Sequence, residues 1–330
     1  MRERKRQKSK KRGMLVALCV VLALILVALI VVAVGLHMYE TYKSKINYVE
    51  NSGVKQSEIY QQLQQSGALM EDDENVINIL LIGQDAREGQ SRQRSDSMIL
   101  CTINRKTDTL TMTSFMRDMY LEIPGYSSNR INAAYQLGGM ELIDLCLLHN
   151  FGVVVDYNVE IDFEGFMKAV DAVGGIDIEL NQDEASYLNA RGNWDVDNST
   201  AWTWDLKEGM NHLTGEQALA YCRIRYVGNA DFGRTERQRK VLDILLDKCK
   251  TLSIFELNDL MHEVLPLVTT DMSPDQIDKY VQTLMPEIMK LKTQQLRIPA
   301  DGTYTDNTED WTLIPDLEKN REILKEAINK

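Results

Sequence analysis

Arginines and carboxylates gather in three short segments that follow apolar runs of the chain. The first segment holds Asp85 and Arg87 directly after one run, and Arg94 and Asp96 lead into the next. Two carboxylates with intervening arginines suit a hard cation, because Mg²⁺ uses one or two carboxylates plus the phosphate oxygens of its substrate. The alternative interpretation of this segment is ordinary turn chemistry with surface ion pairs.

The other two segments contain more arginine than acid. In the second, Arg117 follows an alternating run and Arg130 comes a short loop later. The third segment holds Arg223, Arg225, Asp231, Arg234 and Gln238. An extended chain after Tyr221 would project the first two of these arginines to one side, and a helix would place Arg234 and Gln238 one turn apart on one face.

The third segment is a basic island in an acidic protein. Residues 223–240 contain six Lys or Arg and two acids, whereas the chain beyond residue 36 contains 29 basic and 48 acidic residues. This contrast indicates a specific anion, and arginine suits bidentate binding of phosphate. A solvated helix surface is the alternative. The overall acidity argues against a nucleic-acid partner, because affinity for a phosphate backbone needs a basic face.

Several motifs of other enzyme classes are missing from the sequence. There is no Walker A loop, G-x-G-x-x-G, G-x-S-x-G or H-E-x-x-H, which argues against an NTPase, a dinucleotide enzyme, a serine hydrolase and a zinc protease. The five cysteines form no C-x-x-C pair and the four histidines are scattered, so no zinc-ligand spacing exists. We expect the cysteines of the folded domain to be buried free thiols.

The apolar pattern predicts the elements that would position these residues. Strands are expected at 76–82, 97–103, 109–115, 159–163, 176–180 and 295–298. Helices are expected at 133–148, 164–173, 214–221, 235–250, 274–290 and 315–328. Strands alternating with helices are typical of the α/β class. Residues 189–209 are rich in Asn, Asp, Gly and Trp and are expected to form a long loop or flap.

The N-terminal part predicts a single membrane anchor. Residues 14–36 form an uncharged apolar run of 23 residues behind eight Lys or Arg, which matches the ~30 Å core of a bilayer and a cytoplasmic N-terminus. A cleaved signal peptide is the alternative, although the run exceeds the usual ~7–15 apolar residues. The expected organisation is a basic cytoplasmic tail (1–13), a transmembrane helix (14–36), an extracellular stalk (37–75) and an extracellular domain (76–330).

Ordered segments of this domain resemble the LytR-CpsA-Psr family of membrane-anchored bacterial cell-wall proteins. The resemblance covers residues 76–250 and is carried by INILLIGQDAR, RSDSMIL, SFMRDMYLEIPG, RINAAYQLGG, VEIDFEGFMKAVDAVGGIDIEL, LTGEQALAYCRIRY and DFGRTERQRKVL. It implies an α/β domain with a central mixed β-sheet, flanking helices and an apolar groove for a polyprenyl chain. Apolar residues at 133–148 and 241–246 could line that groove, although core packing explains them equally well.

The resemblance also implies roles for the three segments. Asp85 and Asp96 match the carboxylates that bind Mg²⁺, with Mn²⁺ as a substitute. The arginines that match the pyrophosphate-binding positions are Arg94, Arg117, Arg223 and Arg225. Asp231, Arg234 and Gln238 match a further motif of the same pocket, and we also expect Arg87 to contact substrate. Arg130 stands where many members have Lys, and Met116 replaces the usual Pro before Arg117.

The implied activity is transfer of a glycopolymer phosphate, such as teichoic acid or capsule, from a polyprenyl-pyrophosphate carrier to a peptidoglycan sugar hydroxyl in a Gram-positive-type envelope. The residues expected to act in catalysis are Asp85, Arg94, Arg117, Arg223, Arg225 and Asp231. Spacing does not choose between Asp85 and Asp231 as the general base. Two alternatives use the same residues: a polyprenyl-pyrophosphate glycan hydrolase, and a non-catalytic binding or regulatory protein. Membrane lipid is an expected partner and nucleic acid is not.

Overall fold

The computed structural model describes residues 45–51, 53–67, 69, 73–84, 92–190, 204–277, 279, 280, 283 and 290–329. Residues Ile46–Lys330 form one compact unit. Within the described ranges, no helix has the length and apolar character needed to cross a membrane. The predicted tail (1–13), membrane helix (14–36) and the start of the stalk lie outside those ranges, as do Asp85, Arg87 and residues 191–203 of the predicted flap.

A mixed sheet of seven strands organises this unit, in the order β1-β10-β7-β2-β3-β4-β11. The strands are β1 (Asn47–Tyr48), β2 (Val76–Gln84), β3 (Ser95–Asn104), β4 (Thr109–Phe115), β7 (Tyr157–Asp162), β10 (Val268–Thr270) and β11 (Lys292–Ile298). Strands β2, β3 and β4 are antiparallel, whereas β7 pairs parallel with β2 and β11 pairs parallel with β4. This confirms the predicted central mixed sheet.

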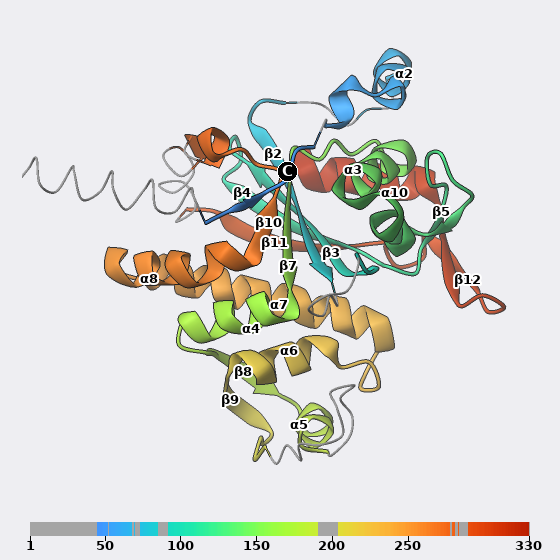
Figure 1. The fold of residues 1–330 in the computed structure, drawn as a ribbon. Helices are drawn as coiled ribbons and strands as arrows, with labels where there is room; N and C mark the ends of the chain where they lie inside the picture. Colours follow the sequence, from blue (N-terminus) through green and yellow to red (C-terminus); the bar gives the residue numbers. More distant parts are fainter. Residues whose placement is uncertain are drawn as a thin grey trace, which may run out of the picture. The chain divides into compact units, whose positions relative to one another are not determined.

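Helices cover both faces of the sheet, which explains why its central strands are apolar throughout. On one face, α3 (Ile131–Phe151) and α10 (Leu317–Asn329) share a core with residues of β2, β3 and β4. On the other face, Leu242 and Leu246 of α7 (Ala230–Thr251) pack against Ile77 and Ile99. Figure 1 shows α3 and α10 above the sheet and α7 below it.

A second core lies among elements that follow β7 in the chain. It joins α4 (Phe163–Ala172), the hairpin of β8 (Ile176–Leu180) and β9 (Gly209–Leu213), α5 (Gln182–Asn189) and α6 (Gly215–Arg223). Helix α8 (Ile254–Val264) contacts α4. At the ends of the predicted flap, the Asn189 amide exchanges two hydrogen bonds with the backbone of Leu206, at 2.7 and 3.0 Å.

Two small hairpins lie beside the main sheet and were missed by the sequence analysis. Strands β5 (Tyr120–Leu121) and β6 (Asn129–Arg130) pair with each other, as do β12 (Tyr304–Asn307) and β13 (Thr312–Pro315). A bridge between Met119 and Leu313 connects the two hairpins. The strands are too short to produce a recognisable alternation of apolar and polar residues.

The structure shows that part of the predicted stalk at 37–75 packs on the domain. Residues 46–67 belong to the domain, because β1 pairs with β10, and Val54 of the 3-10 helix η1 (Val54–Gln56) packs with Tyr60 of α2 (Glu58–Ser66) against Leu148. The segment is rich in Gln and Ser. Its few buried apolar residues therefore produce no clear apolar pattern in the sequence.

A second difference concerns the chain after Tyr221. Helix α6 continues to Arg223, so this part is not the expected extended segment. Helix α7 already begins at Ala230, before the predicted start at 235. The expected helical register within α7 is confirmed, and it places Arg234 and Gln238 on the same lining of a cavity.

Candidate active site

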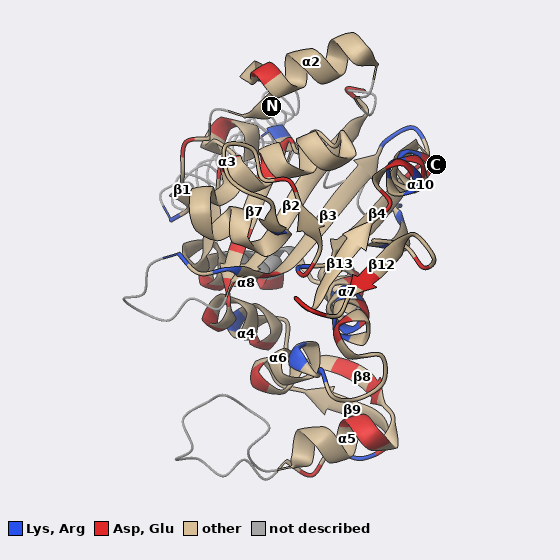
Figure 2. Ribbon diagram, turned by 90° about the vertical axis from the view of Figure 1, so that its right-hand side faces the viewer, with Lys and Arg blue, Asp and Glu red and all other residues tan. Residues whose placement is uncertain are grey.

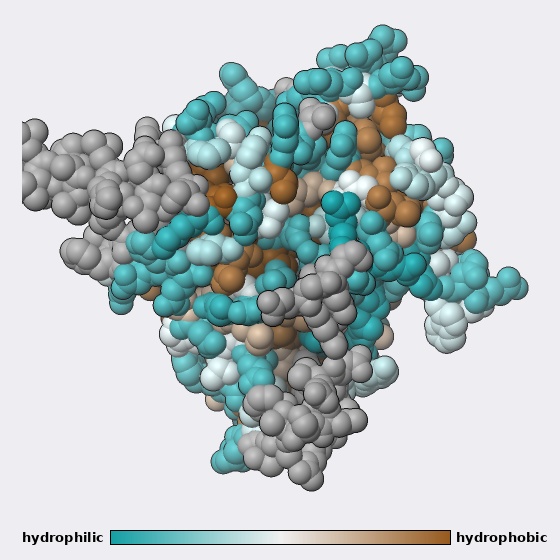
Figure 3. Space-filling view, in the orientation of Figure 1, coloured by the Kyte–Doolittle hydropathy of each residue, from teal (hydrophilic) through white to brown (hydrophobic). Residues whose placement is uncertain are grey.

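An apolar cavity of about 310 Å³ lies between the sheet and the helices α4, α6 and α7. Its apolar lining includes Leu81, Ile99, Val159, Phe163, Phe166, Ala169, Leu219, Leu242 and Leu245. Apolar residues also reach the surface at the centre of the face drawn in Figure 3. Residues 241–246 therefore contribute to the lining as predicted, but residues 133–148 do not, because α3 packs on the opposite face of the sheet.

The same cavity is lined by charged and polar side chains: Asp96, Arg223, Arg225, Arg234 and Gln238. They come from β3, from the end of α6, from the loop after it, which carries Arg225, and from the first turns of α7. Arg223 lies over the ring of Phe163, with 4.6 Å between its guanidinium carbon and the ring centroid. The Ser97 hydroxyl donates a hydrogen bond to Gln238 Oε1 at 3.1 Å. An apolar space and an arginine-rich anion site are thus continuous.

Close approach of β2 and β3 brings Asp96 to this position. The register shifts between Gly83 and Gln84, next to the partner residues Ser95 and Ser97. A Cβ at Gly83 would lie 3.2 Å from the Cβ of Ser97, so a side chain there would require Ser97 to shift by a few tenths of an ångström. Glycine at the end of β2 therefore permits the spacing that holds Asp96 at the cavity.

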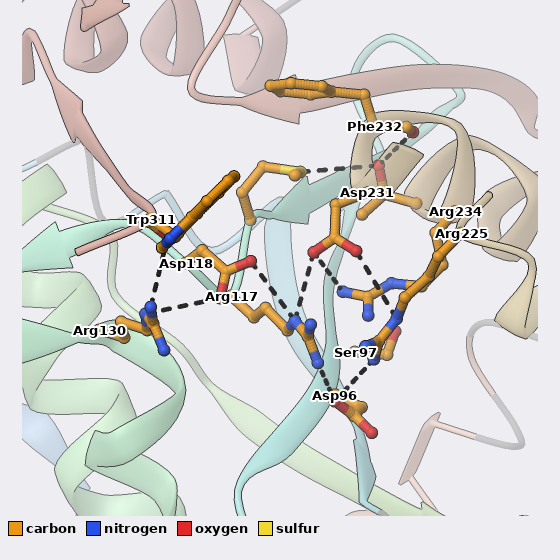
Figure 4. Close-up of polar contacts among 12 residues, drawn as sticks. Asp96, Ser97, Arg117, Asp118, Arg130, Arg225, Asp231, Phe232, Arg234 and Trp311 are labelled. Atoms are coloured by element: carbon orange, nitrogen blue, oxygen red, sulfur yellow. Dashed lines mark hydrogen bonds and ion pairs between the residues drawn. The ribbon is translucent and has the colours of Figure 1, made fainter. Parts of the chain in front are cut away.

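Arg117 lies at the centre of the charged cluster (Figure 4). Its Nη1 is 2.6 Å from Asp96 Oδ1, and its Nε is 3.3 Å from Asp231 Oδ2 and 3.6 Å from Asp118 Oδ2. Burial alone would lower the pKa of Arg117, but the charges of Asp231, Asp118 and Asp96 outweigh that effect and raise it. Arg117 therefore connects the three segments singled out in the sequence, and it stays charged.

Arg234 is buried without matching hydrogen bonds. Its side chain is 3% exposed and its Nη2 lies 3.2 Å from Asp231 Oδ2, yet among the described residues none of its three guanidinium nitrogens has a hydrogen-bond partner. Burial, together with the charge of Arg117, lowers the pKa of Arg234 to about 10. An unsatisfied buried cation that lines a cavity is the feature expected of an anion-binding site.

Two carboxyl groups beside Arg117 have pKa values displaced in opposite directions. Burial would raise the pKa of Asp231, but Arg234 and Arg117 outweigh it and lower the pKa. Burial raises the pKa of Asp118, and contact with Asp231 raises it further despite the opposing effect of Arg117. Asp118 is therefore the carboxyl of this cluster that takes up a proton more readily. Asp118 was not among the predicted site residues, although it is adjacent to Arg117 in the sequence.

Arg130 and Arg225 extend the cluster on either side of Arg117. Arg225 approaches Asp96 and Asp231 at 3.9 and 3.8 Å. Arg130 Nε is 3.8 Å from Asp118 Oδ1. Arg94 is exposed, and its Nε donates to Gln136 of α3; it makes none of the described contacts of this cluster.

Two other basic residues of the 223–240 island serve the fold. Arg237 Nε pairs with Glu184 of α5 at 2.7 Å, and both side chains are buried. Arg239 Nη1 donates to Ser114 Oγ of β4 at 2.6 Å. Fewer arginines of this segment are therefore available to a ligand than the local excess of positive charge indicated.

The described residues include one member of the predicted Mg²⁺ pair, Asp96. Its Oδ1 contacts Arg117. Within the described ranges, no group of three or more His, Cys, Asp or Glu side chains could hold a metal ion. One carboxylate, that of Asp96, lies beside a cluster suited to phosphate. This still fits Mg²⁺, because that ion takes most of its other ligands from water and substrate.

Three of the four described cysteines agree with the expectation of buried free thiols, and the fourth is free but only partly buried. Cys101, Cys146, Cys222 and Cys249 are free, and the first three are buried. Burial raises the pKa of the Cys222 thiol, which lines the cavity, to about 12. This thiol is therefore an apolar contact and not a nucleophile.

Proteins of known sequence are similar to this chain. TagU of Bacillus anthracis, named polyisoprenyl-teichoic acid--peptidoglycan teichoic acid transferase, is 30% identical over 306 residues, which cover 89% of this chain and 91% of TagU. The regulatory protein MsrR of Staphylococcus aureus is 34% identical over 171 residues, which cover 51% of this chain and 48% of MsrR.

Solved structures and a family model are also similar to this chain. The crystal structure of Bacillus subtilis TagT is 27% identical, with a TM-score of 0.63 over 85% of this chain and 98% of TagT. The structure of TagT bound to LI-WTA is also 27% identical, with a TM-score of 0.64 over 86% of this chain and 98% of that one. The model of the LytR_cpsA_psr family matches residues 36–327. With this match and the shared mixed α/β fold, the chain belongs to the LytR_cpsA_psr family.

Proposed function

We propose that this protein transfers an anionic glycopolymer phosphate from a polyprenyl-pyrophosphate carrier to a sugar hydroxyl of peptidoglycan. The observation that carries the proposal is the buried, unsatisfied guanidinium of Arg234 on the wall of an apolar cavity. A ligand that suits both features has a pyrophosphate next to a long hydrocarbon chain. The names of TagU and of the TagT complex favour teichoic acid as the polymer.

The proposed reaction is an in-line displacement at the phosphorus nearest the glycan. The acceptor hydroxyl oxygen forms a bond to this phosphorus, and the bond from phosphorus to the bridging oxygen breaks, so that polyprenyl phosphate leaves. Arg117, Arg225 and Arg234 stabilise the charge that develops on the phosphate oxygens and on the leaving group. The hydroxyl proton passes to the carboxylate of Asp118, the group of the cluster with the raised pKa.

Mg²⁺, or Mn²⁺ in its place, would neutralise further phosphate charge when held by Asp96 and Asp85. Arg223 and Gln238 would contact the pyrophosphate from the cavity wall, and Arg130 from the side of Asp118. Arg87 and Arg94 remain candidate contacts of the glycan.

The proposed location follows from the chemistry of the carrier and the acceptor. A polyprenyl lipid is held in the membrane and peptidoglycan lies outside it, so residues 14–36 would anchor the chain and residues 37–330 would work on the outer side. The relatives in Bacillus and Staphylococcus favour a Gram-positive-type envelope.

The test is incubation of the full chain, in detergent, with a short synthetic polyprenyl-pyrophosphate glycan and peptidoglycan oligomers, with Mg²⁺ or EDTA. Mass spectrometry should detect a metal-dependent glycan-phosphate adduct on the acceptor. Release of polyprenyl phosphate without an adduct would instead identify a hydrolase. Intact bound lipid would identify a binding protein, the second candidate, which the name of MsrR as a regulatory protein favours.

A further inference from the structure

An exposed tryptophan lies next to the charged cluster, on the side away from the cavity. Trp311, at the turn of the β12–β13 hairpin, is 81% exposed. Arg130 Nη2 donates to the backbone carbonyls of Asp310 and Trp311, at 2.5 and 3.4 Å, and Figure 4 shows the indole beside that guanidinium. A single exposed aromatic side chain is common on a protein surface, so it is the position of Trp311 beside the charged cluster that points to a binding surface.

The backbone of Trp311 adopts an uncommon conformation. Its φ of 53° lies in the left-handed region, which is rarely occupied by a bulky side chain. Strain of this kind persists where the surroundings enforce it, and it gathers at functional sites. Here the two carbonyls bound by Arg130 provide such an enforcing contact, so the position of the indole is coupled to a residue of the cluster.

The hairpin is also tied to the two other parts of the site. The amide of Leu313 donates to the carbonyl of Asp118 at 2.9 Å. Tyr304 of β12 stacks on Phe232, which follows Asp231 in the chain, with ring centroids 5.7 Å apart. The hairpin is therefore fixed to the loop that carries Arg117 and to the start of α7, and a ring bound to Trp311 would have a defined place relative to the cluster.

The position of Trp311 indicates which substrate it would contact. Arg225 and Arg234 line the apolar cavity, whereas Asp118, Arg130 and Trp311 do not. The ion pairs run from the cavity through Arg117 and Asp118 to Arg130. In an in-line displacement the attacking and leaving groups lie on opposite sides of the phosphorus. With the leaving lipid phosphate at the cavity, the attacking hydroxyl arrives from the side of Trp311.

The negative charge of the hairpin also favours contact with the acceptor sugar over contact with the donor. Asp306, Glu309 and Asp310 are all exposed near Trp311, and Figure 2 shows the acidic colour on β12. These carboxylates would repel a polyanionic donor chain. An uncharged pyranose ring has an apolar face of C–H groups that suits the face of an indole, and its hydroxyls can bind the neighbouring carboxylates.

We propose that Trp311 and the β12–β13 hairpin form the acceptor subsite, where the indole stacks on an uncharged N-acetylhexosamine ring of the peptidoglycan glycan and presents its hydroxyl to the phosphate site. This proposal rests on the proposed function for the role of the bound sugar, but not for the binding itself. Trp311 is a positioning residue here, and Asp118 lies between it and Arg117.

Two measurements test the subsite with the full chain in detergent. The first is binding of an N-acetylglucosamine tetramer, followed by tryptophan fluorescence in the wild type and in Trp311→Phe, which keeps a ring but removes the indole signal. We expect a saturable change in the wild type that is absent in this variant. Trp311→Ala should weaken binding of the tetramer, measured by calorimetry, about tenfold. The matched control is Ile314→Ala on the same hairpin, because this exposed side chain should leave binding unchanged.

The second measurement separates acceptor from donor by kinetics. In Trp311→Ala, KM for the peptidoglycan acceptor should rise about tenfold while binding of the polyprenyl-pyrophosphate donor stays unchanged. Equal weakening of donor and acceptor, or a wild-type affinity for the tetramer in Trp311→Ala, would overturn the proposal. If the wild type binds the tetramer through Trp311 but transfers nothing, the proposed function fails and the sugar subsite stands.

Discussion

Asp118 and Asp231 both contact Nε of Arg117, yet the pKa of Asp118 is raised and the pKa of Asp231 is lowered. The difference arises because Asp231 also faces Arg234 and Arg225. One carboxylate therefore stays ionised and holds the arginines in place, and the other is suited to exchange a proton. A division of this kind between two adjacent carboxyls separates structural and acid–base roles.

The first prediction concerns the pH dependence of transfer. If Asp118 is the base, kcat/KM should fall as the pH drops through its raised pKa, because only the ionised carboxylate accepts the proton. Asp118→Asn should lower transfer by about 10²-fold or more and remove this acid limb. Asp231→Asn should move the acid limb to lower pH, because it removes a negative charge that raises the pKa of Asp118. A wild-type pH profile in Asp118→Asn would contradict the assignment.

The second prediction concerns the cost of keeping Arg234 buried. Replacing this charge, which lacks hydrogen bonds, with an apolar side chain of similar length should cost little, because its ion-pair partner Asp231 keeps Arg117 and Arg225. Arg234→Met should therefore change the free energy of unfolding by less than about 1 kcal/mol, measured by urea denaturation. It should also abolish binding of a short-chain prenyl pyrophosphate, because that ligand loses its buried cation.

The matched control for Arg234 lies three residues further along the same helix. Arg237 is also buried, but it pairs with Glu184 at 2.7 Å and donates to the carbonyl of Val227. Arg237→Met should lower the free energy of unfolding by about 3–5 kcal/mol, because it leaves Glu184 buried without its partner. If Arg234→Met destabilises as much as Arg237→Met, Arg234 is a structural residue and the proposed anion site loses its main support.

The third prediction concerns the lipid. Ala169 of α4 lines the apolar cavity, and Ala169→Phe would fill part of it. Each methylene of the prenyl chain that no longer fits costs ~0.8 kcal/mol, about a fourfold loss of affinity. KM should therefore rise for a long-chain donor and stay close to the wild-type value for a short-chain donor. An equal effect on both donors would show that the prenyl chain binds elsewhere.

Five strands of the main sheet could be predicted from the sequence, and the central strands β3 and β4 among them are largely buried on both faces. The short strands β1 and β10 were not predicted. The apolar runs at 76–82 and 109–115 lie within β2 and β4. The pattern of charged residues singled out Asp96, Arg117 and Asp231, the resemblance matched them to site positions, and the structure joins them in one cluster. These residues lie far apart in the chain, so spacing alone did not bring them together. The strand order did so, because β3 is antiparallel to β4 and the start of β3 therefore lies beside the end of β4, next to the start of α7.

Other parts of the site depend on contacts that leave no periodic pattern. Trp311 reaches Arg130 only because a hairpin near the C-terminus pairs with the loop after Arg117. Arg234 and Arg237 look equivalent in the sequence, and only the packing of α5 against α7 assigns Glu184 to one of them. The polar helix at Glu58–Ser66 is held by a few buried residues such as Tyr60, which are too few to distinguish it from a stalk.

The last prediction concerns stability and a buried acid remote from the cluster. Asp144 of α3 is 2% exposed, and its Oδ2 accepts hydrogen bonds from the side-chain amides of Asn158 at 2.8 Å and Asn51 at 3.1 Å. Its Oδ1 has no hydrogen-bond partner among the described residues. Burial raises the pKa of Asp144 well above its ordinary value, and the charge of Asp271 adds to this although the amide of Asn158 opposes it.

The raised pKa makes the folded protein bind a proton that the unfolded chain has released. The contribution of Asp144 to stability is therefore fully present below the ordinary aspartate pKa of ~3.9, and it is lost as the pH rises through the raised pKa. Asp144→Asn keeps a neutral group of the same shape, so its free energy of unfolding should exceed that of the wild type by an amount that grows with pH. Urea denaturation at a series of pH values measures this difference, with Asp205→Asn as the control because that side chain is 90% exposed. Parallel curves for Asp144→Asn and the wild type would mean that Asp144 is ionised in the folded protein, and that the two amides, and not a retained proton, stabilise it.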